Sequence, residues 1–234
     1  MRKPAFLFIT CIIITVLMSC KGDPGPADNI FCAQFQQGIL PSTGYTGSED
    51  TFIAESQPNS TNATCSSLTV GGVGGKKYRS LISFTLNTIP AAAIVEDAFL
   101  TLTISQIPGN VTLTAYTIPE SWFMGGAGCS VLGISSYDAT WTAPWTTPGG
   151  AMATQASGPV NVRGGEVRQA TFTLDNSMLQ NWIKLGYAAD PASNHGVMIV
   201  SNTETGTDYM AFYSGDVTNL PEYRPVLSIY YRLP

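Results

Sequence analysis

The chain has 234 residues and a formal net charge of −5; only 12% of the residues are charged, whereas 23 are glycine and 15 are proline. An acidic chain of this kind lacks the basic surface that attracts nucleic acids or anionic lipids, so we expect neither as a charge-driven partner. Its length and its many turn-forming residues predict one all-β domain.

Residues 1–19 have the organisation of an export signal. Arg2 and Lys3 come before an uncharged, mostly apolar run from Pro4 to Ser19, which is shorter than the roughly 20 apolar residues that cross a bilayer. The run ends in LMSC, which resembles the bacterial lipobox, whose cysteine is acylated and becomes the mature N-terminus. We therefore expect Cys20 to be lipidated, and two or three acyl chains attach a protein durably to a membrane.

Residues 20–47 are expected to hold the lipidated cysteine, a tether and an N-terminal extension. GDPGPA, from Gly22, has too few Gly-X-Y triplets for a collagen helix and is interpreted as an extended spacer. Lys21, rather than Asp, follows the cysteine, and the sorting rule of Gram-negative lipoproteins then permits transfer to the outer membrane. Loss of Arg2 and Lys3 leaves 9 basic and 16 acidic residues, a mature charge of −7.

Three cysteines remain once Cys11 leaves with the signal and Cys20 is lipidated. They cannot all pair, so we expect one disulfide, between Cys65 and Cys129, because both lie in loops rich in glycine and serine. Cys32 would then be a free thiol, buried as a small hydrophobe. One histidine and scattered cysteines without CxxC or HxxxH spacing do not predict a zinc site.

From Ile30 onward, short β-branched segments alternate with turn residues, as in an antiparallel sandwich or barrel. Several segments alternate apolar and polar side chains, so one face is expected to pack and the other to be solvated. The predicted strands are 50–56, 67–72, 78–86, 96–105, 110–118, 167–174, 195–202, 208–214 and 225–232.

Residues 174–187 break this pattern. Apolar residues recur there at spacings of one, three and four, namely Met178, Leu179, Trp182 and Ile183. Asp175 or Asn176 can cap the first turn, and Gly186 stands where a helix commonly ends. The stretch predicts one amphipathic helix, lying as a lid over one end of the core.

Seven segments occur in one order: DTFIAES, YRSLISFTLNTIP with AFLTLTI, VTLTAYTIPESW, Thr140-Trp141, LDNSMLQNWIKLG, GVMIVSN and YRPVLSIYY. This order, over residues 48–234, resembles the DNRLRE-type domain of bacterial and archaeal surface proteins. That domain is related to alginate-binding carbohydrate-binding modules and to disaggregatase-associated repeats. The resemblance implies a jelly-roll β-sandwich without a catalytic centre, used for polysaccharide binding or surface display.

The family's positions match this chain at Asp50, Arg79, Arg224 and Pro225. Ser83 and Thr85 stand where the family often has Arg and Asp, and residues 214–216 read Ser-Gly-Asp where it often has Ser-Arg-Glu. These departures remove basic residues and weaken any transfer of binding to an acidic polymer such as alginate.

Two arginines have two interpretations each. Arg79 and Arg224 could contact a sugar carboxylate in bidentate fashion. Alternatively they pair inside the protein, with Asp50, Asp216 or Glu222, which we favour because an internally satisfied pair needs no ligand.

Aromatic residues divide into framework and candidate stacking positions. The resemblance places Trp122, Trp141 and Trp182 on framework positions, so we expect them in the core. The residues that we expect to be exposed for stacking on sugars are Trp145, Tyr78, Tyr187, Tyr209 and Tyr213.

Other chemistry finds little support. The stretch TVGGVGGKKY fails the P-loop spacing at Val70 and Lys77 and predicts a hairpin loop. His195 lacks a nucleophile elbow, and no spacing selects an acid pair from Glu49, Asp50, Asp208 and Asp216. No cofactor is expected, and structural calcium stays open without a DxDxDG loop.

We therefore expect a non-catalytic, lipid-anchored protein of the cell surface that binds polysaccharide or makes adhesive contact with extracellular matrix. One alternative is a structural or display protein that packs against another envelope protein. The other is a small polysaccharide-degrading enzyme.

Overall fold

The computed structural model describes residues 30–106, 109–126, 128–163, 168–184 and 194–234. The export signal, Cys20, the spacer, Gly186 and Tyr187 lie outside these residues. Within the described part of the chain, every pairing between strands is antiparallel, and a single α-helix is present. The all-β fold class with one short helix is confirmed.

All nine predicted strands are present, with ends that move by only one or two residues. Four short strands were not predicted: β1, β3, β8 and β9. The elements are β1 Ile30–Phe35, β2 Ser48–Ala54, β3 Ser60–Thr61, β4 Ser67–Val73, β5 Lys76–Phe84, β6 Ile94–Gln106, β7 Val111–Thr117, β8 Val131–Leu132, β9 Val160–Val162, β10 Gln169–Thr173, α1 Asn176–Lys184, β11 Val197–Ser201, β12 Tyr209–Tyr213, the 3-10 helix η2 Pro221–Tyr223 and β13 Val226–Arg232.

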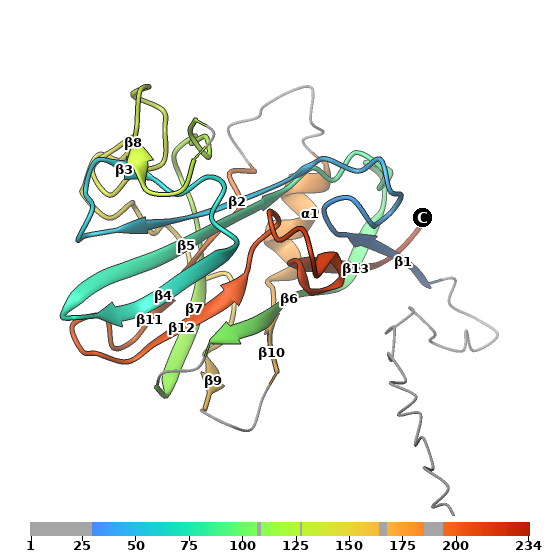
Figure 1. Cartoon of the computed structure of the whole chain (residues 1–234). Coiled ribbons are helices and arrows are strands. Elements are labelled where there is room, and N and C mark those ends of the chain that lie inside the picture. The colour runs from blue at the N-terminus through green and yellow to red at the C-terminus, as the bar shows by residue number, and fades with distance from the viewer. Residues whose placement is uncertain (1–29, 107–108, 127, 164–167, 185–193) are drawn as a thin grey trace, which may run out of the picture.

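Strand β6 joins two sections of the main sheet. Residues 94–103 pair with β13 and β10, whereas Ile104 and Gln106 pair with β12. The first section contains β1, β13, β6 and β10, and the second contains β12, β4, β5, β11, β7 and β9, with β2 on β5. The short pair β3 and β8 lies at one end of the molecule and β1 at the other (Figure 1).

Side chains from both sections meet in one hydrophobic core. Fully buried members are Phe35, Leu100 and Phe172 from the first section and Leu68, Leu113 and Phe212 from the second. Burying a side chain of this size contributes about 1.5–3 kcal/mol. A core shared between two sheet sections is the packing that a sandwich requires, and the jelly-roll connectivity stays a prediction.

Helix α1 covers part of this core, and the predicted helix is confirmed. Leu179 and Ile183 are buried in the core, and Trp182 packs against it half-buried. Asp175 caps the first turn, since the Met178 N–H donates to its Oδ1 at 2.8 Å. Across the described residues, no helix is both long enough and apolar enough to cross a membrane.

Cysteine pairing is partly as predicted. Cys65 and Cys129 form the expected disulfide, which links the end of the β3 loop to the residues before β8. Cys32, expected as a buried free thiol, is half-buried in β1 and disulfide-bonded, so that expectation is wrong.

Candidate functional site

The segment between β7 and β9 folds over the outer face of β2, β5 and β11. A second apolar cluster joins this face to the segment, and contains Ile53, Leu81, Met198 and Val200 from the strands and Trp122, Trp141 and Trp145 from the segment. The indole N–H of Trp122 donates to the His195 carbonyl at 2.8 Å, and that of Trp145 to the Thr140 carbonyl at 2.7 Å. The buried indole N–H groups of Trp122 and Trp145 therefore both have hydrogen-bond acceptors inside the protein, as is usual for core residues.

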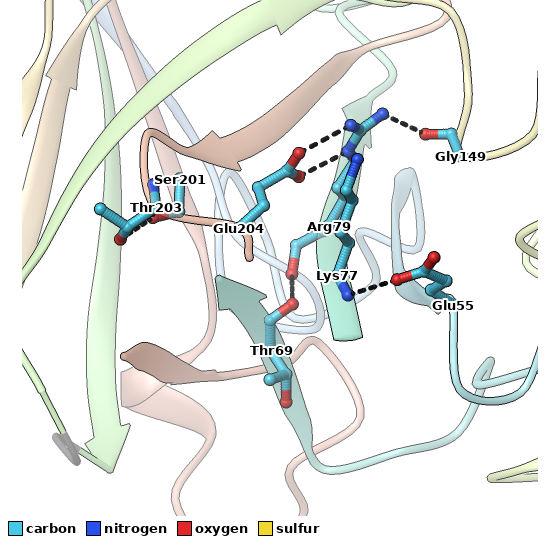
Figure 2. Close-up of polar contacts among 9 residues, drawn as sticks. Glu55, Thr69, Lys77, Arg79, Gly149, Ser201, Thr203 and Glu204 are labelled. Carbon is cyan, nitrogen blue, oxygen red and sulfur yellow. Dashed lines mark hydrogen bonds and ion pairs between the residues drawn. The ribbon is translucent and has the colours of Figure 1, made fainter. Parts of the chain in front are cut away.

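Arg79 fastens this segment to the sheet. Its Nε and Nη2 donate to the two carboxylate oxygens of Glu204 at 2.6 and 2.8 Å, and its Nη1 donates to the Gly149 carbonyl at 2.7 Å (Figure 2). The guanidinium also lies 5.3 Å from the centre of the Trp141 ring, within cation–π range. Gly149 has a φ of +93°, and a Cβ there would lie 2.8 Å from Trp141. Only glycine therefore brings this carbonyl to Arg79 without strain.

The environment of Arg79 makes it a structural residue. It is 8% exposed, and both edges of its guanidinium are occupied by protein acceptors. The internal pairing that we favoured does form, but with Glu204, which the sequence did not single out, rather than with Asp50, Asp216 or Glu222. Glu204 lies more than a hundred residues away in sequence, in the turn after β11.

Arg224 also binds inside the protein. Its Nε and Nη2 donate to the Val217 carbonyl at 3.1 and 2.8 Å, and its Nη1 donates to the Gln37 carbonyl at 2.8 Å. These bonds join the loop after β12 to the loop after β1. Its acceptors are thus backbone carbonyls rather than the predicted carboxylates. Burial raises the pKa of nearby Asp50 and Asp216, and the charge of Arg224 offsets part of this rise.

Asp50 is a buried carboxyl beside this arginine. It is 2% exposed, and its Oδ2 accepts the Gly215 N–H at 2.7 Å, whereas its Oδ1 has no hydrogen-bond partner among the described residues. Burial raises the pKa of Asp50 to about 7, and the negative charge of Asp216 adds to this effect. Burial also raises the pKa of Asp216.

The remaining candidates for sugar stacking are mostly covered. Trp145, predicted to be exposed, is only 6% exposed, because it fills the space between the segment and β11. Tyr78 is half-buried against Phe52, and Tyr209 and Tyr213 are half-buried on β12. Trp122 and Trp141 are buried as predicted. Among the described candidates, the ring contacts are those of Tyr78 with Phe52 and of Tyr213 with Tyr223, and neither contact joins two predicted stacking residues.

Large exposed side chains gather instead on the outer surface of the same segment. We call this group the distal patch; its members, with their exposed fractions, are Phe123 at 57%, Val131 at 38%, Leu132 at 73%, Ile134 at 90% and Tyr137 at 56%. The Phe123 and Tyr137 rings are 6.2 Å apart at an interplanar angle of 84°. The backbones of these two residues are joined as well, since the Phe123 N–H donates to the Tyr137 carbonyl at 3.0 Å.

Covalent and hydrogen-bonded contacts hold the distal patch in place. The Cys65–Cys129 disulfide and the β3–β8 pairing fasten Val131 and Leu132 to residues 59–65. Asp138 closes the next turn, because its Oδ2 accepts the N–H groups of Ile134 and Ser135 at 2.8 and 2.9 Å. Exposed apolar side chains on a tethered loop, rather than a free one, are typical of a contact surface.

In the described ranges, no three His, Cys, Asp or Glu side chains come together where they could hold a metal ion. A cavity of about 10 Å³ near Trp182 is lined mainly by apolar side chains and has room for about one water molecule. His195 is 9% exposed, and Gly74 and Gly75, both with positive φ, close the predicted β4–β5 hairpin.

The sequence did not point to the distal patch. Four of its five residues lie in GCSVLGISSY, where glycine and serine indicate a loop and the apolar residues show no periodicity, and Phe123 precedes this stretch. A usable signal was the predicted disulfide, because Cys129 immediately precedes this run. A disulfide that fixes Cys129 in a loop also keeps the apolar residues that follow it near the surface, so they are candidates for exposure.

Among known proteins, no family model and no curated protein matches this chain. The resemblance to the DNRLRE-type domain therefore stays a prediction that rests on the order of its segments.

Proposed function

We propose that the protein is an exported, non-catalytic binding protein of the bacterial envelope, and that it contacts a polysaccharide through the distal patch. The observation that carries this proposal is the pair Phe123 and Tyr137, two exposed aromatic rings at right angles on a loop that a disulfide fastens. The resemblance to surface-protein domains points to the same class of function.

The aromatic pair has the chemistry that a sugar ring needs. One face of a pyranose carries C–H groups, which pack against the negative face of an aromatic ring. Two rings at 84° can contact one sugar from its face and from its edge. Because both rings already have fixed neighbours, binding orders few additional side chains.

The acidic residues support the non-catalytic part of the proposal. Of the four acids considered, Asp50 and Asp216 lie close enough for the negative charge of Asp216 to add to the raised pKa that burial gives Asp50. Asp50 is 2% exposed and Asp216 is half-buried, so this pair does not present two accessible carboxyl groups to a glycosidic bond at the surface. A glycosidase needs two accessible carboxyl groups on either side of that bond.

The second candidate function is docking to an envelope protein. Leu132 and Ile134 favour it, because branched aliphatic side chains that are 73% and 90% exposed gain more from an apolar protein surface than from a hydroxylated sugar. Both functions use the distal patch. Phe123 and Tyr137 would bind the sugar, whereas Leu132 and Ile134 would contact the envelope protein.

A glycan array with the soluble chain from Lys21 onward separates the two functions. We expect a polysaccharide hit that is lost in the double variant Phe123→Ala/Tyr137→Ala and kept in Leu132→Ser/Ile134→Ser. Leu233→Ser, an exposed apolar residue at the other end of the molecule, is the matched control. Urea unfolding should confirm that each variant stays folded.

Other outcomes count against the polysaccharide. Absence of any glycan hit, with self-association or co-purification of an envelope protein that Leu132→Ser/Ile134→Ser abolishes, favours docking. Release of reducing or unsaturated ends from a polysaccharide mixture would contradict the non-catalytic proposal.

Export and the lipid anchor belong to the same proposal. The basic residues, apolar run and lipobox-like LMSC of the sequence support them. The Cys65–Cys129 disulfide supports export alone, because structural disulfides form and persist in oxidising compartments outside the cytoplasm.

A further inference from the structure

A second group of exposed apolar side chains lies at the opposite end of the molecule from the distal patch. We call it the proximal tip; its members, with their exposed fractions, are Ile30 at 51%, Phe31 at 43%, Ile94 at 37% and Leu233 at 46%. These residues come from the start of β1, the start of β6 and the residue after β13, which the strand pairing places side by side.

The proximal tip is apolar on both faces of the sheet. In the register, Ile30 and Ile94 both lie opposite Arg232 and share its face. Phe31 lies opposite Tyr231 on the other face, where their rings stack at 5.6 Å. Tyr231 also packs against the core, so Phe31 extends the core face at the end of the sheet, while Ile30 and Ile94 add exposed apolar surface on the opposite face.

We propose that the proximal tip rests in the interfacial layer of the membrane to which the N-terminus is attached. This proposal rests on the lipid anchor proposed above. Nine residues lie between Cys20 and Ile30, and the ten Cα–Cα steps that join these two residues cover at most about 35 Å in an extended chain. The start of β1 is thus the part of the described fold that an acylated Cys20 holds nearest to the lipid.

The chemistry of the tip fits a lipid interface better than a charged surface. Tyr231 has an apolar ring and a polar end, as aromatic residues at membrane interfaces do. Arg232 forms an ion pair with Glu96, so the tip offers no unpaired positive charge from this arginine to lipid headgroups. Contact would therefore come from apolar burial and should persist at high salt.

The proposed contact also orients the molecule. The proximal tip and the distal patch lie at opposite ends, as the positions of β1 and of β3 with β8 show (Figure 1). With the tip in the lipid interface, the distal patch faces away from the membrane. That is where an adhesive surface has to be in order to meet a polysaccharide or a neighbouring protein.

Tryptophan scanning in brominated lipid tests the proposal. Phe31→Trp and Leu233→Trp place probes at the tip, and Phe123→Trp is the control at the far end, with the unchanged chain giving the signal of the native tryptophans. The acylated full-length protein is reconstituted in phosphatidylcholine vesicles with and without brominated acyl chains. We expect brominated lipid to remove most of the added emission of both tip variants and none from Phe123→Trp.

The outcomes separate the tip from the anchor. The tip contact alone would be overturned if the protein floats with the vesicles but brominated lipid quenches the emission of the tip variants no more than that of the unchanged chain. This includes the case in which a second copy of the chain covers the tip. Protein that does not float overturns the anchor and this proposal together, whereas glycan binding by the soluble chain is unaffected by either result.

Discussion

Arg79 on β5 and Glu204 after β11 form a two-point ion pair, with Nε–Oε1 at 2.6 Å and Nη2–Oε2 at 2.8 Å, and both side chains are largely buried. The pair lies beside the segment between β7 and β9, which carries the distal patch, since Arg79 also contacts Gly149 and Trp141 of that segment. Because Arg79 also donates to Gly149, one side chain joins the sheet, this segment and the turn after β11. The stability of the fold and the position of the patch are therefore linked through Arg79.

Replacing Arg79 by Ala should destabilise the protein by about 3 kcal/mol, because Glu204 then stays buried without its partner. Urea unfolding followed by tryptophan fluorescence measures this loss. Arg79→Lys should lose less, since it keeps the charge but not the two-point geometry. The double variant Arg79→Met/Glu204→Leu leaves no buried charge unpaired, so its free energy of unfolding should be closer to that of the unchanged protein than the value for Arg79→Ala is. An unfolding midpoint of Arg79→Ala equal to that of the unchanged protein would contradict the structural role.

Asp50 should make the protein less stable as the pH rises. The pKa of Asp50 is about 7 in the folded protein, whereas an aspartate in an unfolded chain has a pKa of about 3.9. The folded state therefore binds this proton more tightly. The contribution of Asp50 is fully present below about pH 4 and is lost as the pH rises through 7. The urea midpoint should be lower at pH 8 than at pH 5.

Asp50→Asn should flatten this pH profile, because the amide cannot ionise. Glu49 and Asp216, whose pKa values are also raised, act in the same direction and should leave a smaller residual slope. Asp175, whose pKa is lowered by its helix-capping hydrogen bonds, acts in the opposite direction. A steep profile that survives in Asp50→Asn would assign the effect to other groups.

Removing the Cys65–Cys129 disulfide should loosen the distal patch. The double variant Cys65→Ser/Cys129→Ser should lose about 2–4 kcal/mol of stability. Hydrogen exchange should rise most in residues 128–133, which this disulfide and β3–β8 fasten together. Substitution removes this disulfide alone, whereas a reductant acts on any disulfide of the chain. An unchanged rate of hydrogen exchange in residues 128–133 would show that the β3–β8 pairing holds this part of the chain without the disulfide.

The lipid anchor makes a chemical prediction about Cys20. Mass spectrometry of membrane-extracted protein should find a mature N-terminal cysteine with two or three acyl chains. Cys20→Ser should abolish the modification and release the protein from the membrane fraction. A mature chain that starts elsewhere, or a Cys20 joined to Cys32 instead of to lipid, would end the lipoprotein proposal.

The fold was predictable because its signals are local. Alternation of apolar and polar residues identified nine strands, and the spacing of Leu179 and Ile183 with a cap at Asp175 identified the helix. The short strands β3 and β8 were missed because a two-residue strand contains no period to detect. Cys65 and Cys129 were paired correctly from the composition of their loops.

The site was less predictable because exposure depends on distant partners. Trp145 has the composition of an exposed loop residue, yet the segment folds back and buries it against β11. Arg79 required an acid, but nothing in the sequence near it indicated Glu204.

By itself, the sequence determined the antiparallel β class and the helix with its cap, because each depends on neighbouring residues and their spacing. The tertiary structure decided which side chains are covered. It buried Arg79 and Trp145 and left Phe123, Leu132, Ile134 and Tyr137 on the surface. Burial is set by contacts between segments far apart in the chain, and these form only once the two sheet sections have packed together.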